Sequence, residues 1–124
     1  MEPNLFAEHF NYVWNFIGDQ KPPFIVLTAA LIIHISISEN IDVLVLETSL
    51  GGAYDAATVF PRPVATGITL LDFEHVEELG KTIEEIAWHK GGIFKAGVPS
   101  FTVHQPIKGA HEALVERCNE IGVC

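Results

Sequence analysis

The sequence has 124 residues, of which 48% are hydrophobic, and sixteen acidic against seven basic side chains give it a formal net charge of −9. This length predicts a single globular domain with a buried core. The acidic balance argues against a surface for nucleic acid or anionic membrane, because neither phosphates nor acidic lipids would be attracted to it.

Two helices are predicted in the first third of the chain. Apolar residues at three- and four-residue steps indicate the first one, through Phe6, Phe10, Val13, Trp14 and Ile17. The prolines within residues 18–23 end it. Residues 24–38 predict a second helix that is apolar on nearly every face, so we expect it to be buried. It falls short of the ~20 apolar residues of a membrane span, and its β-branched residues leave a strand open for part of it.

Strands and helices alternate through the rest of the chain. Residues 41–46, 64–70 and 98–103 predict three strands, and residues 107–121 predict a last helix. Thr82 and Glu85 have the spacing of a capping box, which predicts a helix over residues 82–90 that ends near a glycine pair. The alternation predicts an α/β fold with a three-layer parallel sheet, whose strand ends meet along one ligand-binding edge.

Three separated residues are candidates for chemistry. Glu47 directly follows the first predicted strand, so its carboxylate would face that edge, although it could instead cap its own loop. His75 lies in an acidic loop, where an imidazole is either a metal ligand or a solvated group. Lys90 lies at a predicted helix end, where a cation also complements the helix dipole. The residues alone leave both interpretations open. We expect structural or surface roles for four other histidines: His34, His89, His104 and His111.

Several segments resemble the folylpolyglutamate synthase family of the Mur ligase superfamily. The most specific is residues 86–106, Ile-Ala-Trp-His-Lys-Gly-Gly-Ile-Phe-Lys-Ala-Gly-Val-Pro-Ser-Phe-Thr-Val-His-Gln-Pro. Lys-Pro-Pro-Phe at 21–24, and Leu-Glu at 46–47 before Gly-Gly-Ala-Tyr-Asp at 51–55, match in order and spacing. The resemblance favours the eukaryotic form. It implies that residues 1–124 are part of a Mur-ligase-like central domain, truncated so that the first strand and phosphate loop are missing.

This resemblance implies an ATP-dependent ligase that adds L-glutamate to the γ-carboxyl of tetrahydrofolate through an acyl phosphate, with magnesium. Carried over to this chain, Glu47 and His75 would hold Mg²⁺, and Lys90 would become carbamylated and help to position the metal. His75 and Lys90 would thus be catalytic. The residues carried over to the nucleotide-binding loop are Gly51, Gly52, Tyr54 and Asp55. Magnesium prefers oxygen ligands and retained waters, and phosphoryl transfer depends on placement and charge neutralisation.

The resemblance also carries expectations about partners and location. Tetrahydrofolate and L-glutamate are the expected small-molecule partners, with no nucleic acid and no membrane span. The family is usually monomeric, but an unpaired strand edge in a truncated chain could lead to self-association. The expected location is cytoplasmic, mitochondrial or both.

The chain departs from the family's pattern at three places. Thr-Ser-Leu at 48–50 precedes the glycine pair where Val-Gly-Ile or Val-Gly-Leu is usual, Asp-Ala-Ala-Thr at 55–58 replaces Asp-x-Thr-Asn, and Leu-Asp-Phe-Glu-His at 71–75 replaces Leu-Gly-x-Asp-His. No Gly-x-x-x-x-Gly-Lys-Ser/Thr loop occurs, so we expect the chain alone to be inactive. A degenerate, non-catalytic folate-binding remnant and another Mur-type amide ligase remain alternatives.

Overall fold

A computed structural model describes residues 2–123 of the chain. The backbone divides into two compact units, residues 1–46 and residues 47–124. In the described part of the chain, no helix combines the length and apolar character needed to cross a membrane. The assignment of the whole chain to one Mur-ligase-like domain stays a prediction.

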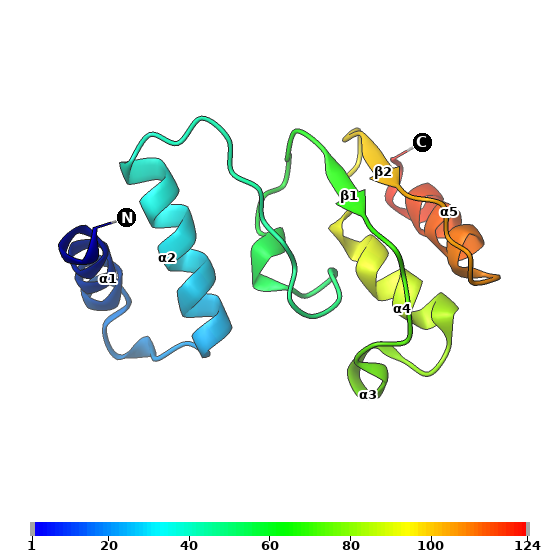
Figure 1. The fold of residues 1–124 in the computed structure, drawn as a ribbon, viewed down its shortest axis with the longest axis horizontal. Helices are drawn as coiled ribbons and strands as arrows, with labels where there is room; N and C mark the ends of the chain where they lie inside the picture. The colour runs from blue at the N-terminus through cyan, green and yellow to red at the C-terminus, as the bar shows by residue number, and fades with distance from the viewer. Residues whose placement is uncertain (1, 124) are drawn as a thin grey trace. The chain divides into compact units, whose positions relative to one another are not determined.

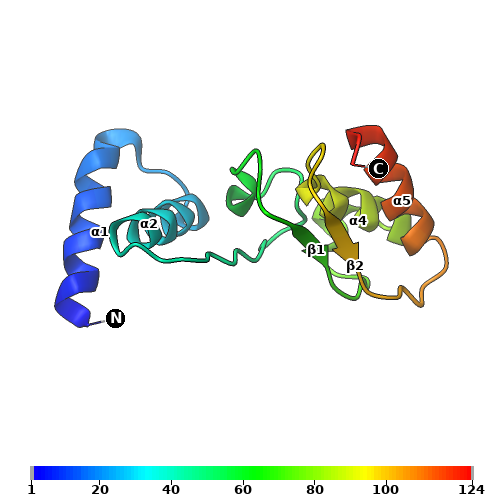
Figure 2. The same ribbon diagram turned by 90° about the horizontal axis from the view of Figure 1, so that it is seen from above.

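The first unit is a helical hairpin of α1 (Pro3–Ile17) and α2 (Phe24–Ser38), joined through the short 3₁₀ helix η1 (Gly18–Gln20). Pro3 occupies the first turn of α1, where its missing N–H costs no hydrogen bond. The two helices cross steeply, since each is seen nearly end-on in one of the two perpendicular views (Figures 1 and 2). Val13 of α1 and Leu31 of α2 are buried in this unit. Both predicted helices are therefore confirmed.

The expected burial of α2 was wrong. Within this helix only Leu31 is buried, whereas Phe24 is 81% exposed and Ile37 is 72% exposed. The physical reason lies in the hairpin: α1 covers one face of α2, and an apolar helix needs partners on several faces to be buried on all of them.

The strand predicted over residues 41–46 is also absent. These residues run as an irregular segment, in which Val43 is 74% exposed and Val45 is 82% exposed. A strand is defined by hydrogen bonds to a neighbour, and no such ladder is formed there. The three-strand expectation was therefore wrong, since the sheet among the described residues has two strands.

The second unit is built on that parallel pair, β1 (Thr66–Ile68) and β2 (Ser100–Thr102), with Thr66 opposite Ser100. The helices α4 (Ile83–Lys90) and α5 (Ala110–Ile121) pack together beside it (Figure 2). Their apolar faces pack against β1 and the residues that follow it. The resulting core is made by Ile68, Leu71, Ile83, Ala87, Phe94, Ala110 and Leu114. The α/β class and the parallel pairing are thus confirmed.

Short helical turns complete this unit: η2 (Ala56–Thr58), α3 (Val76–Leu79) and η3 (Gly91–Ile93). The capping box that opens α4 is confirmed. Thr82 Oγ1 accepts the Glu85 N–H at 3.2 Å, and Glu85 Oε2 accepts the N–H groups of Thr82 at 3.1 Å and Lys81 at 2.8 Å. These backbone donors hold the pKa of the Glu85 carboxyl below its ordinary value.

Candidate functional site

The loop after Glu47 lies directly against the C-terminal end of α4. Ala53 N–H donates to His89 O at 3.0 Å, and a Cβ added at Gly52 would lie 2.6 Å from Lys90 O. A Cβ at Gly92 would lie 2.3 Å from Ala53 Cα. Both glycines are therefore required for close approach of the backbones. The packing brings the loop to the helix end that carries Lys90.

The remaining residues predicted for the nucleotide-binding loop have different surroundings. Asp55 is engaged with its own loop: its Oδ2 accepts the N–H groups of Ser49 at 2.8 Å and Leu50 at 2.9 Å, and its Oδ1 accepts that of Ala57 at 2.8 Å. Tyr54 is 85% exposed, with its ring centroid 6.2 Å from that of His89. The aspartate thus shapes the loop, while the tyrosine leaves an aromatic face open.

The space beside the glycine pair at positions 51 and 52 is filled by protein atoms and is not a cavity. Gly51 has a φ of 66°, in the region that favours glycine, and a Cβ there would lie 2.9 Å from Leu79 Cδ2. The space beside both Cα atoms is filled by the protein itself. These glycines consequently fix the loop on α3 and α4, and their Cα faces do not outline a cavity for phosphate.

The three proposed metal-site residues lie in the same unit, but no hydrogen bond or ion pair between residues 2 and 123 joins any two of them. Glu47 and His75 are exposed, and Lys90 is half-buried at the end of α4. His75 caps the start of α3 with a left-handed backbone, φ 51° and ψ 42°. Its carbonyl accepts the Leu79 N–H at 2.8 Å. This backbone geometry fixes the position from which the His75 side chain starts, at a turn of the chain.

The donor chemistry fits magnesium only in part. Across the described residues there is no group of three or more His, Cys, Asp or Glu side chains placed to hold one metal ion. Glu47 is an oxygen donor that Mg²⁺ accepts, whereas the Lys90 amine becomes an oxygen donor only after carbamylation. A magnesium ion bound through one or two protein oxygens keeps several waters, so this sparse set suits a shared metal–phosphate site rather than an all-protein cage.

The glycine-lysine sequence in this unit is not a phosphate loop. Gly80-Lys81-Thr82 has the last three residues of such a motif, but the N–H groups of Lys81 and Thr82 both donate to Glu85 Oε2. A phosphate at this turn would have to displace a carboxylate. The capping box therefore takes the donors that an anion would need.

A groove of about 730 Å³ runs along α3, α4 and α5, with Trp88 and His89 in its lining. Seven of its lining residues are acidic: Glu77, Glu78, Glu84, Glu85, Glu112, Glu116 and Glu120. Carboxylates at this density repel the phosphates of a nucleotide. The groove is therefore a poor candidate for the nucleotide site.

One positioning residue was not identified from the sequence. Gln105, which is 6% exposed, accepts the Leu71 N–H through Oε1 at 2.9 Å. Its Nε2 donates to Thr69 O at 2.8 Å and to Thr102 Oγ1 at 2.9 Å. The amide thus ties the carboxyl ends of β1 and β2 together, at the edge where parallel sheets place their ligands. Only the pairing of the strands reveals this role.

Comparison with known proteins gives a consistent result. No protein-family model matches the sequence. The chain is 37% identical to human mitochondrial folylpolyglutamate synthase over 98% of its own length and 22% of the relative. It is 39% identical to folylpolyglutamate synthase of Neurospora crassa, over 96% of the chain and 24% of the relative.

Solved structures agree with the sequence comparison. A complex of FPGS with AMPPCP and folate matches 79% of this chain and 23% of its own, with a TM-score of 0.73 and 31% identity. The apo form of L. casei FPGS matches 90% of this chain and 27% of its own, with a TM-score of 0.77 and 28% identity. The chain spans about a quarter of these relatives. It is therefore a homologue of the folylpolyglutamate synthases, with a Mur ligase fold, and corresponds to that part of their length.

Proposed function

We propose that this chain supplies part of the catalytic domain of an ATP-dependent ligase that adds L-glutamate to the γ-carboxyl of tetrahydrofolate. The observation that carries the proposal is the 37–41% identity to folylpolyglutamate synthases along most of the chain. A solved complex of this family with AMPPCP and folate supports ATP and a folate as the ligands. The three-layer, truncated central-domain architecture belongs to the same proposal.

The proposed site centres on the loop that the glycines hold against α4. Glu47 and His75 would hold the metal, and Lys90 would supply a carbamate oxygen after its uncharged amine attacks CO₂ and loses a proton. Magnesium, when bound, neutralises charge on the transferred phosphoryl oxygens.

The expected location and the behaviour of the isolated chain complete the proposal. Relatives in human and Cricetulus griseus are named as mitochondrial, which supports a mitochondrial location besides the cytoplasmic one. The sequence contains no complete phosphate loop, so the chain alone is expected not to ligate glutamate. Incubation with tetrahydrofolate, ATP, Mg²⁺ and labelled glutamate checks this expectation, and glutamylated product would contradict it.

The metal site is tested by paramagnetic relaxation with Mn²⁺ in place of Mg²⁺. We expect Mn²⁺ with AMPPCP to broaden the amide NMR signals around Glu47, His75 and Lys90 in the purified chain. Glu47→Gln removes the carboxylate and should raise the Mn²⁺ concentration needed for this broadening at least about tenfold, since even the loss of a group that supports a metal ligand costs about 10–100-fold in metal affinity. Glu116→Gln, in the acidic groove, is the matched control and should change nothing. Broadening of signals from the acidic groove, in place of those around Glu47, His75 and Lys90, would contradict the proposed metal site.

The lysine is tested separately with ¹³C-bicarbonate. A carbamate carbon signal distinct from those of the α-amino group and the other lysines should appear at alkaline pH in the wild-type chain, and this signal should disappear in Lys90→Met. The exposed Lys108 provides the control, since Lys108→Met should leave the signal in place. A signal that survives Lys90→Met would remove Lys90 from the proposed metal site without affecting the family assignment.

A non-catalytic folate-binding remnant is the second candidate. The use of the Asp55 carboxylate within its own loop and the changed residues Ser49, Asp72 and Glu74 favour it. Calorimetric titration separates the candidates: folate binding that is indifferent to Mg²⁺ and nucleotide supports the remnant, whereas coupled binding supports the ligase.

A further inference from the structure

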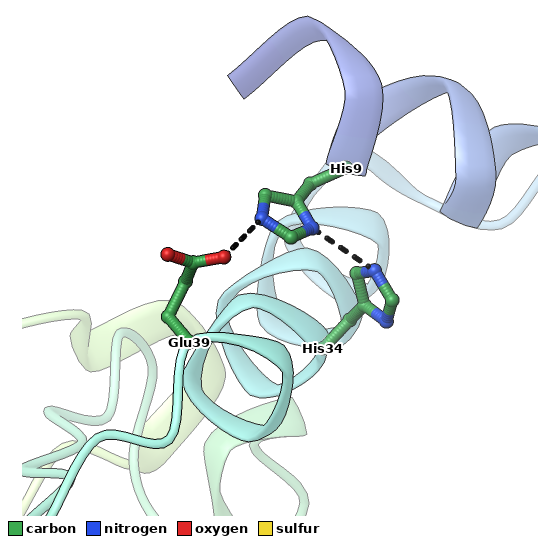
Figure 3. Close-up of polar contacts among 3 residues, drawn as sticks. All are labelled: His9, His34 and Glu39. Atoms are coloured by element: carbon green, nitrogen blue, oxygen red, sulfur yellow. Dashed lines mark hydrogen bonds and ion pairs between the residues drawn. The ribbon is translucent and has the colours of Figure 1, made fainter. Parts of the chain in front are cut away.

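Three ionisable side chains connect the helices of the first unit (Figure 3). His9 of α1 is central: its Nδ1 lies 3.2 Å from His34 Nε2, and its Nε2 lies 3.1 Å from Glu39 Oε1. His34 belongs to α2, and Glu39 is the C-cap residue of that helix. His9 is only 8% exposed, whereas the Glu39 side chain is 39% exposed, so the buried ring depends on these two partners for its hydrogen bonds.

The number of protons in this cluster is limited by its geometry. His9 Nε2 carries a proton, because the ionised Glu39 carboxylate can only accept. Between His9 Nδ1 and His34 Nε2 there is room for one proton, since two facing N–H groups at 3.2 Å would repel. Both hydrogen bonds therefore persist when both imidazoles are neutral and when one is charged. A second imidazolium breaks the bond between the rings.

We propose that His9, His34 and Glu39 form a pH-sensitive clasp, closed while at most one imidazole is charged and open when both are. Closed, the clasp holds α1 against α2 and keeps Val13 and Leu31 buried. Open, it frees the two helices to separate and exposes those apolar side chains. Histidine is suited to this role because its charge changes between pH 5 and 8.

The other ionisable groups of this unit do not compensate for the second charge. Tyr12 stacks on His34, with ring centroids 4.6 Å apart and planes inclined by 7°. In the described part of the unit, no ion pair or hydrogen bond reaches either histidine from the remaining charged side chains: Glu2, Glu8, Asp19, Lys21 and Asp42. Among the described residues, Glu39 is thus the one carboxylate that bonds to the pair, and its negative charge balances a single imidazolium.

The sign of the pH effect follows from proton binding. In acid the open state takes up two protons on the histidines, whereas the closed clasp accepts one. Stability falls with falling pH wherever the open state binds more protons. A difference of one proton raises the open population by up to about tenfold per pH unit. The hairpin is therefore tightest at neutral and alkaline pH.

Hydrogen exchange on the whole 124-residue chain measures this opening. With EDTA present, and with rates corrected for intrinsic exchange, amides of α1 and α2 should lose protection by up to about tenfold per pH unit in mild acid. His34→Gln is the key variant, because its amide can replace Nε2 as a hydrogen-bond partner without titrating. It should reduce the slope to roughly twofold or less. His111→Gln removes an exposed histidine of the other unit and should keep the wild-type slope.

Nitrogen NMR of the wild-type histidine rings tests the proposal even if His34→Gln fails to fold. At pH 8 the clasp requires a proton on His9 Nε2 and on His34 Nε2, with His9 Nδ1 bare. Two results would overturn the proposal: both rings fully protonated while the hairpin amides stay protected, or a folded His34→Gln chain with the wild-type slope.

Discussion

Three residues of the second unit determine how its backbone segments pack: two glycines, which lack a side chain, and one glutamine, which uses its side-chain amide. Gly52 and Gly92 allow the loop and the end of α4 to touch, and Gln105 joins the ends of the two strands. Neither role depends on charge. The glycines and Gln105 position the backbone around the proposed site. Substitutions at these residues therefore test the position of the backbone without changing a proposed metal ligand.

Gly52→Ala should dislodge the loop. The added methyl would fall 2.6 Å from Lys90 O and 2.7 Å from Ile93 Cγ2, distances that force the backbone to move. Overpacking of this kind costs about 1–3 kcal/mol. We expect a lower unfolding midpoint in urea and faster exchange of the Ala53 amide. Gly67→Ala, where a Cβ meets nothing within 4 Å, is the control. Equal losses in the two variants would contradict the close-packing argument.

Gln105→Leu should destabilise the strand pair more than Thr102→Val. The leucine leaves Leu71 N–H and Thr69 O without the side-chain partner that Gln105 provides, at a cost of about 1–3 kcal/mol per buried group. Thr102→Val removes one of the three Gln105 hydrogen bonds, together with the exposed one from Thr102 Oγ1 to Val103 O at 3.2 Å, and keeps a β-branched shape. Urea unfolding, followed through the exchange of amides in β1 and β2, compares them. A smaller loss for Gln105→Leu would show that the amide does not hold the strand ends.

Residue contacts could be predicted from the sequence only where they are local. Thr82 and Glu85 are three positions apart, so the capping box was visible and is confirmed. Gln105 reaches partners 34 and 36 residues away, and His9 reaches partners 25 and 30 residues away. A single sequence contains no signal for such pairs. The metal roles of Glu47, His75 and Lys90 stay predictions, because no hydrogen bond or ion pair among residues 2–123 joins these side chains.

Helices were more predictable than strands. The patterns for α1, α2, α4 and α5 depend on neighbours within one or two turns, and all four helices form. The predicted strands that contain β1 and β2 also form in their central residues. The segment at 41–46 has the same apolar character, but its residues form no ladder of strand hydrogen bonds. Apolar composition identifies a possible strand, whereas pairing decides whether it exists.

The capping box of α4 should give the second unit an acid-dependent stability. Because the pKa of Glu85 is lowered by backbone N–H donors, its contribution is complete above the carboxyl's unfolded pKa. The contribution is lost as pH falls through the lower, folded pKa. Glu85→Gln should therefore flatten the acid limb of stability, measured as urea midpoints from pH 7 to pH 3. Glu116→Gln is the matched control, and an acid limb unchanged in Glu85→Gln would contradict the assignment.

Taken as a whole molecule, the chain has much apolar surface that its own fold does not cover. The exposed side chains include Phe24, Ile37, Val43 and Val45, and this is unusual for a stable monomer. The overall family and α/β class could be predicted from the sequence, because motifs and alternating elements depend on residues that are close together along the chain. Burial could not, because it depends on what surrounds each element.

We expect this surface to cause self-association of the purified chain. Sedimentation velocity should show a weight-average coefficient that rises with protein concentration. Val45→Lys places a charge on the exposed segment and should shift the association to at least several-fold higher concentration, since unpaired apolar segments are blunted by lysine. Gln20→Lys adds the same charge at an exposed polar position and should have little effect. Concentration-independent sedimentation of the wild-type chain would refute this expectation.

At His75 the backbone conformation favours glycine, whereas the proposed metal role requires the imidazole side chain. Its left-handed conformation costs an L-residue about 1–2 kcal/mol, which glycine largely avoids, although glycine has more freedom in the unfolded chain. A chain optimised for durability alone would thus tend to lose the imidazole at this turn. A His75→Gly substitution made to increase stability would therefore remove the imidazole whose metal role is proposed.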